Sequence, residues 1–138
     1  MNRLQEIEAR LAAIANEIEQ RGAELTAEQL TAFETEVNNL KTERAGLMAA
    51  AETYAQELGL AFQIRDDMLD VCGDAAEFGK PIGSDREEGK TTFVDILGLN
   101  GCQRVIEAHS ESAVEALGDM EDTDFLIHLV RVLEKREQ

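Results

Sequence analysis

The chain has 138 residues, of which 43% are hydrophobic, enough for the core of one modest domain. Its formal net charge of −16 disfavours nucleic acid and anionic membranes as partners and favours divalent cations. Because no long apolar run and no signal-peptide pattern occur, we expect a cytoplasmic protein without membrane insertion. Cys72 and Cys102 lack metal-ligand spacing, and we expect both thiols to be buried and inert.

Residues 1–51 have the pattern of a coiled-coil-like helical hairpin. Apolar residues recur at spacings of three and four in two series, first Leu4, Ile7, Leu11, Ile14 and Ile18, then Leu30, Phe33, Val37, Leu40 and Leu47. A break around Gly22 separates the series, and Thr26 with Gln29 has the spacing of a capping box. Two helices joined by such a short turn are expected to pack antiparallel.

The remaining residues, 52–138, are also predicted to be helical. We expect one helix over 51–72, ended by Gly73, and then a glycine-containing loop over 73–90. Further helices are predicted over 92–97, 102–117 and 123–136, with a break at 98–101. No strand pattern is present, so the whole chain is predicted to be all-α, with a domain boundary between residues 51 and 52.

Three carboxylates, those of Asp66, Asp67 and Asp70, interrupt an apolar stretch of the predicted helix 51–72. Asp66 and Asp70 are four residues apart and share one helix face, where two like charges repel each other. A bound cation would relieve this repulsion, and Mg²⁺ is typically held by one or two carboxylates together with substrate phosphates. The alternative is a solvated acidic face with no ligand.

The loop 73–90 carries two lysines, Lys80 and Lys90, each directly after a glycine. Gly83 and Gly89 are separated by five residues where a P-loop requires four, so a P-loop is not predicted. A cation on one side and two ammonium groups on the other would form a clamp for a diphosphate.

The acidic motif belongs to an ordered series of motifs: GLAFQIRDDMLD (59–70), GD (73–74), GKPIGSD (79–85), GKTTF (89–93) and LGLNG (97–101). With this series, residues 54–138 resemble the C-terminal part of a polyprenyl diphosphate synthase of the farnesyl/geranylgeranyl type. The resemblance implies part of an isoprenoid-synthase-type helical bundle. It also implies Mg²⁺ as cofactor and an allylic (prenyl) diphosphate as ligand, ionised for attack by isopentenyl diphosphate.

The resemblance also implies roles for individual residues. Asp66 would bind Mg²⁺ directly, Asp67 and Asp70 would act largely through water, and Lys80 and Lys90 would hold the allylic diphosphate.

Supporting roles fall to neighbouring residues. Gln63 and Asp85 would orient metal-bound water and the lysines. Phe62 would line the prenyl pocket, the alternative being simple packing in the core. His109 and His128 have no partner apparent in the sequence, so we expect surface or core residues.

Members of this family place their active site between two aspartate motifs, and this sequence contains one. We therefore assign no catalytic residue and expect a truncated synthase-like chain that is inactive alone. A partner chain or a second copy in a homo-oligomer would have to supply the missing half; an inactive fragment or fusion is the alternative.

The hairpin supports a third interpretation, in which it is the functional part. Its segments MNRLQEIEARLAAI and FETEVNNLKTERAGL resemble the N-terminal helical segment of tailed-phage major capsid proteins, which implies a phage-derived or generic scaffold for assembly.

Overall fold

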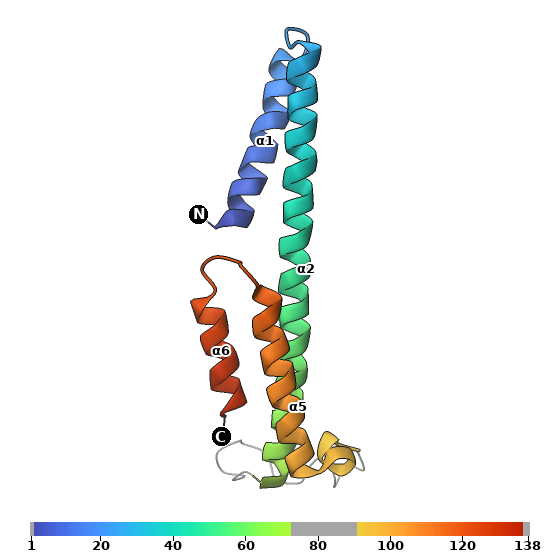
Figure 1. Ribbon diagram of the computed structural model, residues 1–138, viewed down its shortest axis with the longest axis vertical. Helices are drawn as coiled ribbons and strands as arrows, with labels where there is room; N and C mark the ends of the chain where they lie inside the picture. The colour runs from blue at the N-terminus through green and yellow to red at the C-terminus, as the bar shows by residue number, and fades with distance from the viewer. Residues whose placement is uncertain (1, 73–90, 137–138) are drawn as a thin grey trace. The chain divides into compact units, whose positions relative to one another are not determined.

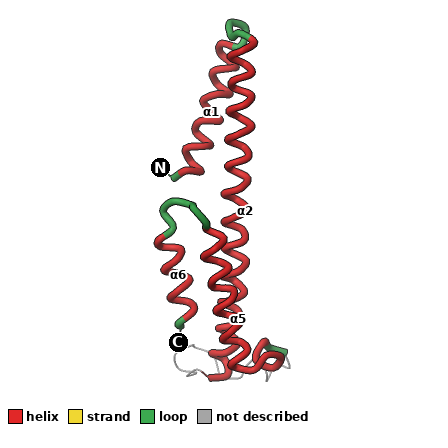
Figure 2. The backbone as a smooth tube through the Cα atoms, viewed as in Figure 1, coloured by secondary structure: helices red, strands yellow, loops and turns green. Residues whose placement is uncertain are grey.

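The computed structural model describes residues 2–72 and 91–136, which form four helices and no strand (Figure 2). The helices are α1 (Arg3–Arg21), α2 (Ala27–Cys72), α5 (Phe93–Leu117) and α6 (Asp124–Glu134). The predicted all-α class is therefore confirmed. The predicted loop 73–90 lies outside the described residues.

The chain divides into two compact units. The hairpin unit comprises Met1–Ala50 with Met120–Asp122, and the motif unit comprises Ala51–Asp119 with Thr123–Gln138. Helix α2 begins in the first unit and ends in the second.

The hairpin unit is built from α1 and the first part of α2, which run antiparallel (Figure 1). Ile7 and Ile14, at 0% and 1% exposure, form the buried centre of the predicted apolar series. The series becomes exposed toward the turn, where Ile18 and Leu30 are 37% and 40% exposed. The buried part of the apolar stripe is thus shorter than its sequence pattern suggests.

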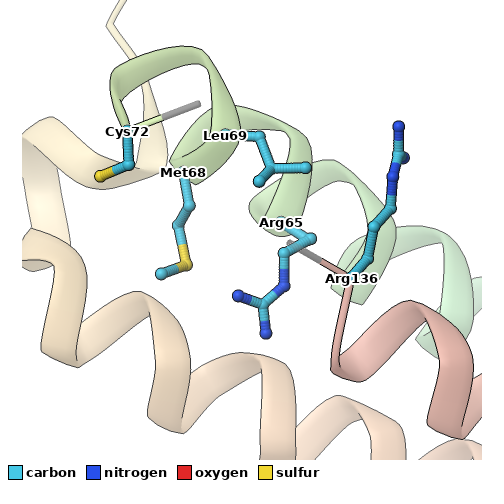
Figure 3. A pocket seen from close by; sticks show the side chains of 5 residues that line it. All are labelled: Arg65, Met68, Leu69, Cys72 and Arg136. Atoms are coloured by element: carbon cyan, nitrogen blue, oxygen red, sulfur yellow. The ribbon is translucent and has the colours of Figure 1, made fainter. Parts of the chain in front are cut away.

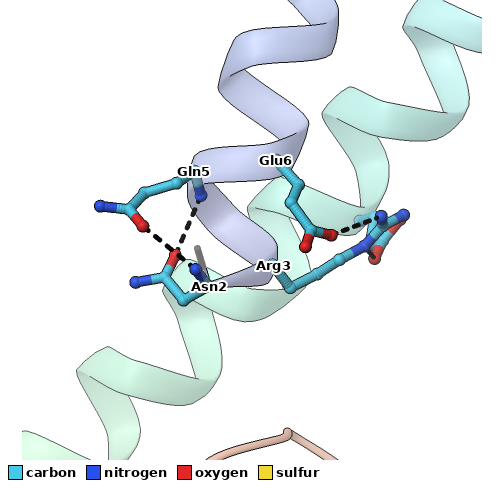
Figure 4. A network of polar contacts seen from close by, with 5 residues as sticks. Asn2, Arg3, Gln5 and Glu6 are labelled. Atoms are coloured by element: carbon cyan, nitrogen blue, oxygen red, sulfur yellow. Dashed lines mark hydrogen bonds and ion pairs between the residues drawn. The ribbon is translucent and has the colours of Figure 1, made fainter.

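Capping boxes begin both helices of the hairpin. At α2, the Gln29 amide donates to Thr26 Oγ1 over 3.1 Å, and the Thr26 amide donates to Gln29 Oε1 over 2.9 Å, which confirms the predicted box. The same reciprocal pair joins Asn2 and Gln5 at the start of α1 (Figure 4). Each pair satisfies two of the amide groups that a helix leaves unpaired at its first turn.

Helix α2 is continuous over 46 residues, so the expectation of a separate helix beginning near residue 51 is wrong. The junction reads AGLMAAAETYA over residues 45–55, and its alanines have the highest helix propensity of any residue. The single Gly46 in this stretch weakens a helix without breaking it.

The motif unit has its own core, where the end of α2 packs on α5. The buried cluster consists of Ala61, Ile64, Val94, Cys102 and Ile106. Helix α6 packs on α5, and its Leu126 carbonyl accepts a 2.8 Å hydrogen bond from the buried Tyr54 hydroxyl of α2.

A kink at Gly98 divides α5, which confirms the predicted break. The residue adopts φ 69° and ψ 169°, a conformation that is open almost only to glycine. The break is shorter than predicted, because the helix resumes directly and buries Gly101 and Cys102 against the core.

Candidate functional site

The acidic motif occupies the last turns of α2. Asp66 and Asp67 are half-buried. Asp70 is only 2% exposed and follows the buried Leu69. Burying a carboxylate is costly unless the group has interaction partners. The alternative of a solvated acidic face is therefore wrong for Asp70.

The donor set of Asp66 and Asp70 fits Mg²⁺. The two carboxylates lie one helical turn apart on one side of α2 and offer the oxygen ligands that hard cations prefer. Across residues 2–72 and 91–136, no three His, Cys, Asp or Glu side chains form a group that could hold a metal ion. A cation on this pair would thus depend on water and on phosphate oxygens to complete its shell.

The expected diphosphate ligands Lys80 and Lys90, and the supporting Asp85, fall within 73–90 and so lie outside the described residues.

Asp67 lies against the start of α5. Its Oδ2 accepts a 3.1 Å hydrogen bond from the Phe93 backbone amide, the first residue of that helix. The preceding Thr92 forms a capping box with Asp95, whose Oδ2 accepts from the Thr92 amide at 3.0 Å and from its hydroxyl at 3.1 Å. The structure thus brings the second aspartate of the motif to a helix terminus 26 residues further along the chain.

The two cysteines differ in environment. Cys102 is fully buried, and burial raises the pKa of its thiol, with the nearby Asp67 carboxylate raising it further. The expected burial of Cys102 is therefore confirmed. A thiol whose pKa is raised is a poor nucleophile and metal ligand, and the inertness of Cys102 stays a prediction. Cys72 is exposed, because it ends α2, and the expectation that it is buried is wrong.

Arg65 precedes the acidic motif and joins three helices. Its Nη2 donates to Gln103 Oε1 of α5 at 2.9 Å and to the Glu134 carbonyl at the end of α6. A small pocket of about 210 Å³ lies beside it, lined by Arg65, Met68, Leu69, Cys72 and Arg136 (Figure 3). The two guanidinium groups point in different directions in that view, so they do not converge on one anion.

Of the three supporting residues, Phe62 and Gln63 lie in the described part of the chain, and both are exposed. Phe62 is 42% exposed, with the Arg136 guanidinium 5.6 Å from its ring centroid, so the core-packing alternative is wrong. Its assignment to a prenyl pocket stays a prediction.

Several contacts of the motif unit were not predicted. No partner of His109 is apparent in the sequence, but in the structure its Nδ1 lies 2.5 Å from Glu57 Oε2. No local signal joins residues 52 positions apart on two helices. The Thr92–Asp95 box could have been found, because a threonine three residues before an acidic residue at the start of an apolar run is its usual signature.

Comparison with known proteins identifies the family to which the chain is related. The family model for polyprenyl synthetase matches residues 8–126. The farnesyl diphosphate synthase of Haemophilus influenzae is 44% identical over 64 residues, covering 46% of this chain and 22% of the relative. That of Geobacillus stearothermophilus is 45% identical over 62 residues, covering 45% and 21%, and that of Escherichia coli is 47% identical over 53 residues, covering 38% and 18%.

The matched regions thus span about a fifth of each of these relatives. None of the described helices is long and apolar enough to cross a membrane.

The family match begins within α1, so most of the hairpin falls inside the matched range. The resemblance of this hairpin to phage capsid segments stays a hypothesis, which these comparisons do not support. The family model covers most of the sequence, including all of α2 and α5, and we conclude that the chain belongs to the polyprenyl synthetase family.

Proposed function

We propose that this chain binds Mg²⁺ together with the diphosphate of an allylic prenyl diphosphate, as one side of a prenyl-transfer site. The single observation that carries the proposal is the placement of Asp66 and Asp70. They form a carboxylate pair on one side of α2, with Asp70 at 2% exposure, in a chain of the polyprenyl synthetase family.

The proposed roles are those that the resemblance to polyprenyl diphosphate synthases implies. Asp66 binds the cation directly and Asp70 acts through water. Two carboxylates leave most of an octahedral Mg²⁺ shell to water and phosphate oxygens. The bound cation supplies neutralisation of the departing diphosphate. Lys80 and Lys90 add charge-assisted hydrogen bonds to the same diphosphate.

We propose further that this chain alone does not elongate a prenyl chain. Its sequence holds a single DDxxD motif, whereas the family's chemistry is expected to need a second aspartate motif facing the first. Without it, stabilisation of the leaving group is incomplete. A second copy of the chain or a different partner chain would complete the site.

The test of ligand binding is titration calorimetry with Mg²⁺, with and without inorganic diphosphate. We expect weak binding of Mg²⁺ alone and tighter binding with diphosphate present. Asp66→Ala should abolish the diphosphate-dependent gain. Glu115→Gln is the matched control, since it removes an exposed carboxylate of α5 away from the motif. Equal binding by wild type and Asp66→Ala would remove Asp66 as a ligand.

A second assay tests the claim of inactivity. Radiolabelled isopentenyl diphosphate is incubated with an allylic diphosphate, Mg²⁺ and the wild-type chain, and no labelled product is expected. Robust product formation would show that the chain completes a site by itself or as an oligomer, and would overturn this part of the proposal.

A further inference from the structure

We infer that Asp67 is a positioning residue that anchors the first turn of α5, and that it is not a ligand of the metal. The inference refines the proposed Mg²⁺–diphosphate site, and only its binding measurement rests on that proposal. It divides the three aspartates of the motif into two that face a ligand and one that organises the helix packed beside them.

The first observation is the hydrogen bond between Asp67 Oδ2 and the Phe93 amide, at 3.1 Å. A helix leaves its first amide groups without partners inside the helix. In α5, the capping box of Thr92 and Asp95 satisfies the amides of those two residues, and Asp67 satisfies the Phe93 amide, one of the two that lie between them. A carboxylate at this end of a helix is also favoured by the helix dipole.

The second observation is the face of α2 on which Asp67 lies. Residues three before and four after it on a helix share its face. Those residues are Ile64, which belongs to the core shared with α5, and Val71, which packs against that core. Asp70, three residues after Asp67, also lies close to this face, whereas Asp66 lies about 100° around the helix from Asp67.

The third observation is electrostatic and agrees with the placement of Asp67 that the hydrogen bond shows. The Asp67 carboxylate contributes to the raised pKa of the fully buried Cys102 of α5, so its charge is felt inside the interface between the two helices. All three observations orient Asp67 toward α5.

Three variants separate anchoring from metal binding. Asp67→Asn removes the charge but keeps a side-chain oxygen that can accept from the Phe93 amide. Asp67→Ala removes both the charge and the acceptor. Asp66→Asn removes one charge from the ligand pair and leaves the anchor intact. Circular dichroism confirms that each variant is folded.

The first measurement is amide hydrogen exchange at Phe93, without metal or diphosphate. A hydrogen bond from a partly buried amide to a charged group should make exchange about tenfold slower. We expect Asp67→Ala to lose about this factor, Asp67→Asn to retain most of it, and Asp66→Asn to match the wild type. Unchanged exchange in Asp67→Ala would overturn the inference.

The second measurement is calorimetry with Mg²⁺ and inorganic diphosphate. We expect Asp67→Asn to stay within about twofold of the wild-type affinity, because a positioning role needs the acceptor and not the charge, whereas Asp66→Asn should lose binding. Loss of binding by Asp67→Asn to the same extent as by Asp66→Asn would make Asp67 a metal ligand and overturn the inference. If the wild type itself does not bind Mg²⁺ and diphosphate, the proposed function is wrong. The exchange rate at Phe93 still tests whether Asp67 anchors α5.

Discussion

The hairpin unit and the motif unit use their polar side chains in different ways. In the hairpin, Arg3 and Arg10 form two-pronged ion pairs with Glu43 and Glu36, with closest distances of 2.6 and 2.5 Å, and all four side chains are well exposed to solvent. Exposed ion pairs of this kind contribute little to stability, because water screens them and long side chains lose entropy. The two pairs thus link α1 to α2 without adding much to the stability of the hairpin.

In the motif unit, polar groups lie inside the packing. The Tyr54 hydroxyl, in a side chain that is 7% exposed, donates a hydrogen bond to the Leu126 carbonyl. Asp67 accepts one from the Phe93 amide, and Asp70 is buried. Removing one partner of a buried polar contact costs more stability than removing one at the surface, because the remaining buried group is left without a hydrogen bond. One continuous helix, α2, therefore carries exposed ion pairs near one end and polar contacts within the packed core near the other.

The largest expected effect is in the core of the motif unit. Ile106 is 0% exposed, and Ile106→Ala should lower the free energy of unfolding by about 2–5 kcal/mol through lost burial and a residual cavity. The control Ile96→Ala, at a side chain that is 70% exposed, should change it by less than about 0.5 kcal/mol. Urea denaturation followed by circular dichroism measures both, and similar midpoints would refute the assigned core.

The next largest effect on stability is expected from replacing two glycines, one from each unit. Gly98→Ala should destabilise by about 1–3 kcal/mol, because its φ of 69° and ψ of 169° strain any side chain although there is space for one. Gly46→Ala, in the middle of α2 with nothing within 4 Å of an added Cβ, should stabilise by about 1 kcal/mol. Thermal unfolding should therefore shift in opposite directions, and a shift of the same sign in both variants would contradict the kink.

The smallest effect concerns pH and the hairpin. The pKa values of Glu36 and Glu43 are lowered from 4.5, chiefly by hydrogen bonds from Arg10 and Arg3. A lowered pKa in the folded state contributes stability that is present above the unfolded value and lost as pH falls through the folded one. The double variant Glu36→Gln, Glu43→Gln should thus show a shallower loss of thermal stability below about pH 4.5. Identical pH profiles would mean that the ion pairs contribute nothing in solution.

The amino-acid sequence by itself determined the features that depend on neighbouring residues. The helical periodicity, the capping box at Thr26 and the break at Gly98 all follow from interactions within one or two turns. The same local physics explains the mistaken start of a helix near residue 51, because a change in composition resembled a boundary while every residue there could continue the helix. The spacing of Asp66 and Asp70 on one face was equally available from the sequence.

Only the tertiary structure decided which partner each polar side chain has. The Asp67–Phe93, Arg65–Gln103 and Glu57–His109 contacts join residues 26, 38 and 52 positions apart, on helices whose relative rotation no local pattern encodes. That rotation is set by the packing of apolar side chains such as Ile64 and Ile106 between α2 and α5. Because the core fixes which face of α2 meets α5, it also brings Asp67 to the first turn of α5.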